Sequence, residues 1–171
     1  MQESGVNVGH DLIPNEAAES NVYVARAGAF LGTISISDTV RPESEQAIKE
    51  IHDLGIRTML LTGDTQAVAD AVSTQLRIKD VAAELLPEDK RHEVIRLVAS
   101  GRTVAMLGDG VNDAPALIEA QVGVAMGSGT DVARESADVV LLGNDLLKFV
   151  ETLKIARRTS PRALVRCGLL P

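Results

Sequence analysis

Aromatic side chains, cysteine and long apolar runs are all scarce in this sequence. Phe, Trp and Tyr make up 2% of its 171 residues and Trp is absent, so the core must be aliphatic. The single cysteine, Cys167, excludes an internal disulfide and a cysteine-ligated metal cluster. No apolar stretch approaches the roughly 20 residues that span a bilayer. We therefore expect the chain as given to be soluble.

Basic residues are also in the minority. Seventeen Lys and Arg against 24 Asp and Glu give a formal net charge of −7. This balance provides no electrostatic footprint for nucleic acid, so we expect no nucleic-acid partner. Residues 1–20 lack the basic start and apolar stretch of a signal peptide. The remaining aliphatic composition is typical of buried parallel strands beneath alanine-rich helices.

Hydrophobic periodicity predicts two strands followed by alternating helices and strands. The first two strands cover about 21–26 and 30–37, with a turn at Ala27-Gly28. Five further strands are expected at 56–61, 81–85, 102–107, 122–126 and 138–142. This alternation indicates an α/β fold with a mostly parallel sheet.

Prolines and glycines mark the helices between these strands. Pro42 and Pro87 are suited to the first helical position, and Gly55 is suited to ending a helix. The glycine-rich stretch at 127–131 is expected to form a turn before the N-cap of a short helix. For the helix that follows Asp64 and Thr65, the predicted apolar positions are Ala67, Val68, Ala71, Val72 and Leu76.

Two carboxylates four residues apart, Asp109 and Asp113, follow an aliphatic strand. Mg²⁺ prefers one or two carboxylates completed by waters and phosphate oxygens, so this pair could hold that ion. Gly108 and Gly110 would let the backbone approach a phosphate or adopt a positive φ. Asn112 adds a neutral donor and acceptor. The alternative is a turn capped by Asp and Asn side chains.

Another strand ends at Thr62, Gly63 and Asp64. The Thr62 hydroxyl and the N–H groups after it could donate to a phosphoryl oxygen, and the alternative is a helix cap or a plain turn. Lys90, one turn into a later helix, could neutralise phosphate charge. The alternative for Lys90 is a solvated surface lysine.

Four motifs occur in a characteristic order: TGD at 62–64, LLPEDK at 85–90, MLGDGVNDAPAL at 106–117 and VGVAMGSGTDVARESADVVLL at 122–142. Together they resemble the haloacid-dehalogenase-type phosphorylation domain of P-type ATPases, especially the branch that transports heavy metals. The resemblance covers roughly 21–158. It implies a Rossmann-like, three-layer α/β fold with a mostly parallel but incomplete sheet.

The resemblance also implies domain limits. Residues 1–37 would be the end of a nucleotide-binding domain, 38–158 the phosphorylation domain and 159–171 an atypical tail. The parent protein would use ATP and Mg²⁺, through an aspartyl-phosphate, to move a cation such as copper, zinc or cadmium. This domain would lie on the cytoplasmic side and contact the parent's membrane domain.

The resemblance assigns a role to each matched residue. Asp109 would hold Mg²⁺ together with Asp113. The residues that support the phosphate would be Gly108, Gly110 and Asn112. The residues that contact or neutralise the phosphoryl group, or shape its loop, would be Thr62, Gly63, Asp64 and Lys90.

The family's nucleophile is absent from the sequence. It is an aspartate in an Asp-Lys-Thr-Gly-Thr motif, and no such motif occurs here. Asp38 follows a strand, but it matches the segment that returns from the nucleotide-binding domain, so we identify no nucleophile. Related soluble phosphatases use an Asp-x-Asp pair, which is absent as well. We therefore expect that the isolated chain does not phosphorylate itself.

Two other functions stay open from the sequence. One is a non-catalytic or regulatory module that binds Mg²⁺ or phosphate, and the other is a small-molecule phosphatase. A missing strand would also leave an open sheet edge, which could drive self-association. A basic cluster near the end of the chain would face a membrane in the parent, or would complement a helix dipole. Its members are Lys154, Arg157, Arg158, Arg162 and Arg166.

Overall fold

The computed structural model describes residues 20–27, 29–36 and 39–159. The chain divides into two compact units, Met1–Val40 and Arg41–Pro171. The predictions for the first 19 residues, for Asp38 and for the tail after residue 159 lie outside the described residues.

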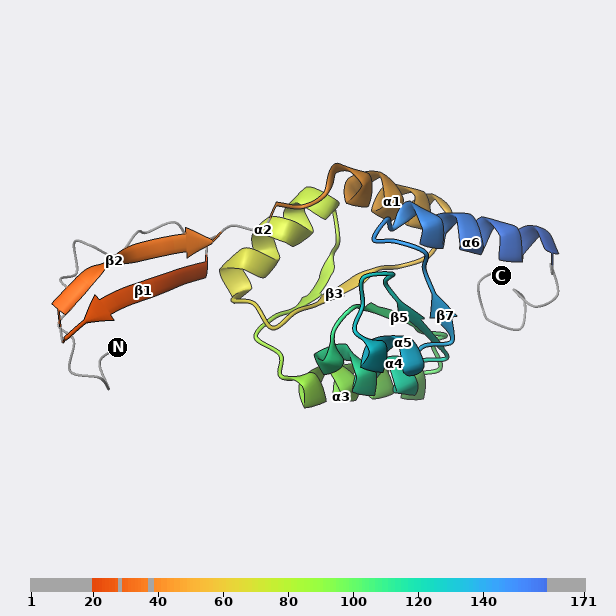
Figure 1. The fold of residues 1–171 in the computed structure, drawn as a ribbon. Helices are drawn as coiled ribbons and strands as arrows, with labels where there is room; N and C mark the ends of the chain where they lie inside the picture. Colours follow the sequence, from red (N-terminus) through yellow and green to blue (C-terminus); the bar gives the residue numbers. More distant parts are fainter. Residues whose placement is uncertain (1–19, 28, 37–38, 160–171) are drawn as a thin grey trace. The chain divides into compact units, whose positions relative to one another are not determined.

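The first unit contains an antiparallel hairpin, as the alternating pattern predicts (Figure 1). Strand β1 (Ser20–Arg26) pairs with β2 (Ala29–Ile36), and the register shifts once along β1. The rings of Tyr23 and Phe30 lie 6.4 Å apart. Ala27 begins the turn with a φ of 49°.

The second unit alternates helices and strands in the predicted order (Figure 1). Its helices are α1 (Pro42–Asp53), α2 (Gln66–Leu76), α3 (Pro87–Ala99), α4 (Ala114–Glu119), α5 (Asp131–Glu135) and α6 (Leu147–Thr159), with a 3₁₀ turn, η3 (Val111–Asp113), before α4. Its strands are β3 (Met59–Leu61), β4 (Asp80–Ala82), β5 (Ala105–Gly108), β6 (Val122–Ala125) and β7 (Val139–Val140). Several strands are shorter than their apolar runs, because only part of each run pairs with a neighbour.

The strands of this unit pair in parallel, which confirms the predicted α/β class. However, they form two sheets, β3–β4 and β5–β6–β7. Among the described residues, no hydrogen-bonded ladder joins β3 to β5. The expectation of an incomplete parallel sheet is therefore met by a sheet in two parts.

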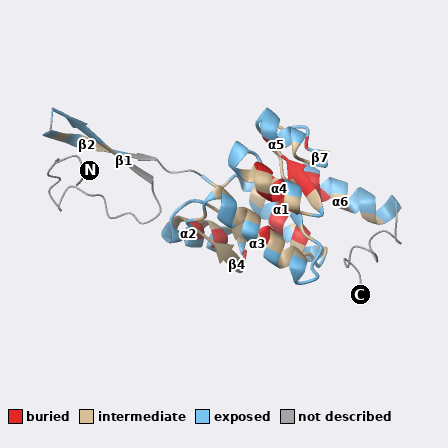
Figure 2. Cartoon of the chain, turned by 90° about the horizontal axis from the view of Figure 1, so that it is seen from below, coloured by how far each residue is buried: buried red, intermediate tan, exposed pale blue. Residues whose placement is uncertain are grey.

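Helices cover both faces of these strands and give the expected three layers. One buried cluster joins α1 and α6 to the strands through Ile48, Ile51, Phe149 and Val150. A second cluster joins α3, α4 and α5 on the other face, and it includes Val94, Ala116, Leu117 and Ala133. Buried residues gather in the interior of the unit, whereas most of α6 is exposed (Figure 2).

The buried side of α2 agrees only in part with the predicted one, because Val68, Val72 and Leu76 are half-buried as expected. Ala69 and Ser73 are buried, while Ala67 and Ala71 are exposed. Ser73 tolerates burial because its hydroxyl donates to the Asp70 carbonyl at 3.0 Å. A polar residue with a local partner therefore takes the inward position.

Cations near the end of α6 bind α1. The Lys154 ammonium donates to a Glu50 carboxylate oxygen at 2.6 Å, and Arg157 donates to the Leu54 carbonyl at 2.6 Å. Part of the predicted basic cluster therefore connects two helices. Among the described residues, no helix is both long and apolar enough to cross a bilayer.

The Glu50–Lys154 pair predicts a pH-dependent contribution to stability. The hydrogen bond from Lys154 lowers the pKa of Glu50 below its ordinary value of 4.5. A carboxylate whose pKa falls on folding stabilises the protein above its unfolded pKa, and this contribution disappears as pH falls through the folded pKa. We expect Glu50→Gln to lower the melting temperature slightly at neutral pH, because the pair is partly exposed.

The difference in melting temperature should vanish on acidification below pH 4.5. Thermal melts followed by circular dichroism between neutral pH and pH 3 would measure it. Lys154→Met should show the same convergence, because it removes the other partner. A difference that stays constant across this range would contradict the assignment.

Candidate metal and phosphate site

The site lies where β3 and β5 end and two loops begin. Asp113 is the centre of the second loop. One of its carboxylate oxygens accepts a hydrogen bond from the Lys90 ammonium at 2.9 Å. The other accepts from the backbone N–H groups of Asp109 at 3.3 Å and Gly110 at 3.4 Å. This single carboxylate therefore anchors α3 to the loop after β5.

Lys90 is not a solvated surface lysine. Its side chain is 15% exposed and that of Asp113 is 13% exposed, so the ion pair is largely removed from water. The position of Lys90 follows from the start of α3, where Pro87 occupies the first helical turn. Asp89 accepts from the Leu86 N–H at 3.0 Å and closes this helix start. The structure thus brings together two predicted residues that lie 23 positions apart in the chain.

Asp109 has a different environment from Asp113. Asp109 is exposed, and among the described residues its carboxylate has no hydrogen-bond or ion-pair partner. Its backbone is held on both sides, since its N–H binds Asp113 and its carbonyl accepts from the Thr130 N–H at 2.9 Å. A fixed backbone with a free carboxylate is suited to binding a cation.

The two positions beside Asp109 differ in how strictly the structure requires a glycine there. A Cβ on Gly108 would lie 2.5 Å from the Cβ of Asp113, so only glycine permits this close approach. Gly110 has a φ of −109°, and an added Cβ would meet nothing nearer than 3.8 Å. Neither glycine has the positive φ that the sequence left open.

The loop after β3 is held by its own contacts. The Thr62 hydroxyl donates to the Asp64 carboxylate at 2.7 Å and accepts from the Asp64 N–H at 3.1 Å. A Cβ on Gly63 would lie 3.3 Å from the Leu85 carbonyl. Among the described residues, no hydrogen bond or ion pair joins this loop to Asp109 or Asp113. The two predicted groups of residues thus occupy the ends of two strands in different sheets, each with its own contacts.

Three residues that the sequence analysis did not single out complete the surroundings of Asp109. Arg41, Ser128 and Asn144 line a cavity of about 210 Å³ together with Asp109. The Asn144 side-chain oxygen accepts from the Ser128 N–H at 2.8 Å, and its carbonyl accepts from Arg41 at 3.2 Å. In the sequence, the polar pair Asn144-Asp145 directly after the last strand was the signal that could have identified Asn144.

The described residues contain no group of three or more His, Cys, Asp or Glu side chains placed to hold a metal. The ring of His52 is half-buried and its Nε2 lies 2.7 Å from the Thr58 hydroxyl. The donor set at the loop after β5 is the pair of carboxylates of Asp109 and Asp113. Mg²⁺ commonly takes one or two carboxylates and completes its shell with water and phosphate. The chemistry of these residues therefore fits Mg²⁺.

The parallel strands, the helical layers and the polar strand ends define a class of protein. A family model for haloacid dehalogenase-like hydrolases matches residues 9–121. The chain belongs to this family.

Curated relatives within that class are named as metal-transporting ATPases. Copper-transporting ATPase 1 of Rhizobium meliloti (strain 1021) is 46% identical over 84% of this chain and 17% of its own length. The zinc-transporting ATPase of Bacillus subtilis (strain 168) is 43% identical over 84% of this chain and 22% of its own length. The chain therefore spans about a fifth of the length of these relatives.

A solved structure shares the fold. The crystal structure of a zinc-transporting PIB-type ATPase in the E2.Pi state superimposes with a TM-score of 0.73 and 41% identity. The match covers 90% of this chain and 25% of that chain. The predicted resemblance to the heavy-metal branch of P-type ATPases is thereby confirmed.

Proposed function

We propose that this chain is the phosphorylation-domain part of an ATP-driven heavy-metal transporter and holds a Mg²⁺-dependent phosphoryl-transfer site. The observation that carries the proposal is the exposed carboxylate of Asp109, which has no partner among the described residues, beside the largely buried Lys90–Asp113 pair. Relatives named as copper- and zinc-transporting ATPases support the transport role. The metal transported in the parent is the cargo and is distinct from Mg²⁺.

Asp109 would bind Mg²⁺ directly, and Asp113 would complete the negative surroundings from behind it. The bound ion would supply positive charge that stabilises phosphoryl oxygens. Lys90 would balance the Asp113 carboxylate and add a cation at the same place. Asn112, exposed on η3, would offer an amide to the phosphate or its waters.

Thr62 would contribute a hydroxyl donor to the phosphoryl group. To do so it would exchange its present acceptor, the Asp64 carboxylate, for a phosphoryl oxygen. Gly63 keeps the loop close to the Leu85 carbonyl and so supports this geometry. Positioned donors and cations are the main requirement of phosphoryl transfer, because little covalent chemistry is asked of the protein.

In the parent, ATP would donate the phosphoryl group to an aspartate, and a membrane domain would carry the metal from the cytoplasmic side. The given sequence lacks the aspartate motif of this family, so the isolated chain would not label itself. Incubation with radiolabelled ATP and Mg²⁺ followed by acid precipitation tests this. Acid-stable label that disappears in Asp38→Asn would overturn it.

Binding of Mg²⁺ is the direct test of the site. We expect Mg²⁺ to raise the melting temperature of the wild-type chain, because a ligand of the folded state adds about 2.7 kcal/mol at 100 times its Kd. Asp109→Asn should lose most of this increment, since it removes the free carboxylate. Asp53→Asn, on the exposed face of α1, is the matched control and should keep it. Calorimetric titration of each variant with MgCl₂ measures the affinity.

Two further measurements test the specificity of Mg²⁺ binding. One is a titration with Ca²⁺, and the other is the change in amide chemical shifts. In two-dimensional NMR, Mg²⁺ should move the amide signals of Asp109 and Gly110 more than those of α1. Equal Mg²⁺ affinity in Asp109→Asn and the wild type would refute the assignment of this residue.

A further inference from the structure

We propose that Asn144 is a positioning residue for Asp109 and acts through the loop that follows β6, residues 126–130. Its side chain holds this loop against the backbone of Asp109, and the loop keeps the Asp109 carboxylate in the direction that binds Mg²⁺. This inference rests on the proposed function, because it explains how the ligand of the ion is fixed. The role requires no contact between Asn144 and the ion.

Three loops meet at one end of the sheet that contains β5 and β7 (Figure 1). The strands of this sheet are parallel and lie in the order β5–β6–β7. The carboxyl ends of parallel strands lie at the same edge of a sheet, so the loops that follow them are adjacent. Asp109 begins the first loop, residues 126–130 form the second, and Asn144 lies in the third. The second loop therefore lies where it contacts both of the others.

The second and third loops are joined by hydrogen bonds from two successive residues. The Gly127 N–H donates to the Gly143 carbonyl at 2.9 Å, and the Ser128 N–H donates to the Asn144 side-chain oxygen at 2.8 Å. The backbones also touch, because a Cβ on Gly127 would lie 2.2 Å from the Gly143 nitrogen. Of these contacts only the bond to Asn144 uses a side chain, so a substitution there removes it selectively.

The second loop is packed in turn against Asp109. The Thr130 N–H donates to the Asp109 carbonyl at 2.9 Å. A Cβ on Gly129 would lie 3.2 Å from the same carbonyl oxygen, so the two backbones approach closely. Since the Asp109 carboxylate has no partner among the described residues, its direction depends on how its backbone is held. Residues 128–130 thus connect the Asn144 side chain to that backbone.

Asn144 is itself held on both sides. Its backbone carbonyl accepts a hydrogen bond from the Arg41 guanidinium at 3.2 Å. The carboxylate of the next residue, Asp145, accepts from the Leu147 N–H at 2.9 Å and fixes the start of α6. The Asn144 side chain is half-buried on this fixed backbone. A ligand is held precisely when the residues that support it are themselves locked in place, and Asn144 meets this requirement.

The chemistry of the amide explains why asparagine suits this position. The Ser128 N–H needs an acceptor, so the amide oxygen faces it and the NH₂ group points elsewhere. Asn144 lines the cavity of about 210 Å³ beside Asp109, and Asp109 is the only acidic residue in that lining. Asn144→Asp would keep the acceptor and add a second negative charge to the cavity. Asn144→Leu would keep the approximate size of the side chain and remove the acceptor.

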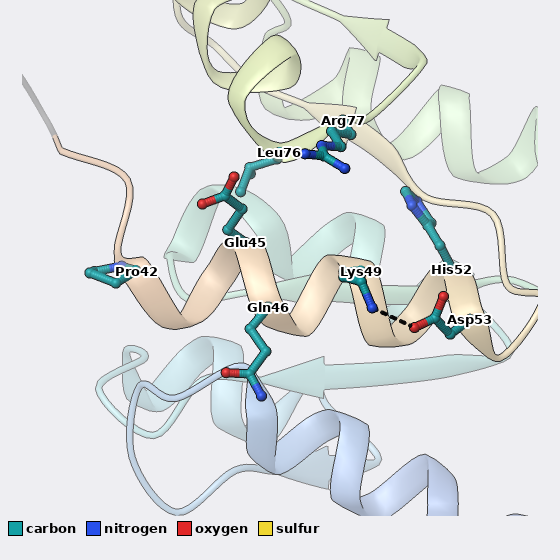
Figure 3. Close-up of a pocket in the computed structure, with 8 residues that line it drawn as sticks. All are labelled: Pro42, Glu45, Gln46, Lys49, His52, Asp53, Leu76 and Arg77. Carbon is teal, nitrogen blue, oxygen red and sulfur yellow. Dashed lines mark hydrogen bonds and ion pairs between the residues drawn. The ribbon is translucent and has the colours of Figure 1, made fainter.

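Calorimetric titration of the full chain with MgCl₂ tests the proposal. We expect Asn144→Leu to weaken Mg²⁺ binding about tenfold, the lower end of the range for residues that orient metal ligands. Gln46→Leu is the matched control. The Gln46 amide donates to the Glu50 carboxylate at 2.9 Å, but it lies on α1 at a different cavity (Figure 3). This control should keep the wild-type affinity.

The conservative variant Asn144→Asp separates positioning from a general loss of stability. It should bind Mg²⁺ at least as tightly as the wild type, because it restores the acceptor and adds negative charge. Asn144→Ala should weaken binding as Asn144→Leu does, and it carries the test if Asn144→Leu does not fold in circular dichroism. Weak binding by Asn144→Asp would overturn the proposal. So would wild-type affinity in a folded variant that lacks the acceptor.

Hydrogen exchange followed by NMR gives a measurement that needs no Mg²⁺. In the metal-free chain, Asn144→Leu should speed the exchange of the Ser128 and Thr130 amides by about tenfold, the upper range for the loss of one hydrogen bond. Asn144→Asp should leave both amides protected. Faster exchange at Ser128 alone would show that the effect does not reach the bond to Asp109, and it would overturn the proposal.

The wild-type titration distinguishes a failure of this proposal from a failure of the proposed function. If the wild type binds Mg²⁺, Asp109→Asn removes that binding and Asn144→Leu keeps the wild-type affinity, only the role of Asn144 is refuted. If the wild type does not bind Mg²⁺, both the site and its positioning residue are refuted.

Discussion

Replacing Lys90 by Met is expected to destabilise the chain by about 3–5 kcal/mol, because it leaves a largely buried carboxylate without its counter-charge. Asp113 is 13% exposed, and its second oxygen is already bound by two backbone N–H groups of the loop. The lost cation therefore cannot be replaced by full solvation. Urea unfolding followed by circular dichroism gives the difference in unfolding free energy.

Lys49→Met is the matched control for this change. Lys49 forms an ion pair with Asp53 on α1, but its side chain is 71% exposed, so its loss should cost less than about 1 kcal/mol. Adding Asp113→Asn to Lys90→Met should recover part of the stability, because the buried charge is then gone. If Lys90→Met costs no more than Lys49→Met, the buried pair does not stabilise the fold.

Gly108→Ala is expected to have the second largest effect, about 1–3 kcal/mol of lost stability, the range for overpacked interiors. The new Cβ would lie 2.5 Å from the Cβ of Asp113, and this atom is too near its own backbone to move independently. The loop after β5 would have to shift and weaken its contact with Lys90. Thermal and urea unfolding measure the loss, and NMR shows the shift.

Gly110→Ala provides the comparison within the same loop. An alanine Cβ there has ordinary contacts at 3.8 Å and beyond, and the φ of −109° suits any residue. Its stability should stay within about 0.5 kcal/mol of the wild type, as for a surface substitution. Equal losses in Gly108→Ala and Gly110→Ala would contradict the close approach of Asp113.

Local sequence signals predicted the elements of the fold well. Pro42 and Pro87 begin α1 and α3, and Gly55 follows α1 with a φ of +75°. The Thr130 hydroxyl accepts from the Ala133 N–H at 3.3 Å and caps α5. These features depend on a few neighbouring residues, so the sequence contains the information directly.

Features that depend on distant partners were harder to predict. The extent of β3 is set by its register with β4, so the apolar run from residue 56 overstates it. The pairing of Lys90 with Asp113 joins two elements, and nothing near Lys90 in the sequence indicates it. The role of Asn144 likewise depends on Ser128, which is 16 residues away.

In the proposed function, the hydrogen bond between Thr62 and Asp64 would link the binding of metal and of phosphate. A phosphoryl group that takes the Thr62 hydroxyl brings a second anion beside the Asp64 carboxylate, in a site where Asp109 is also negative. A divalent cation at Asp109 would offset that repulsion. Affinity for inorganic phosphate should thus rise with Mg²⁺ concentration, and phosphate should tighten Mg²⁺ binding by the same factor. The two ligands would behave as a thermodynamically coupled pair.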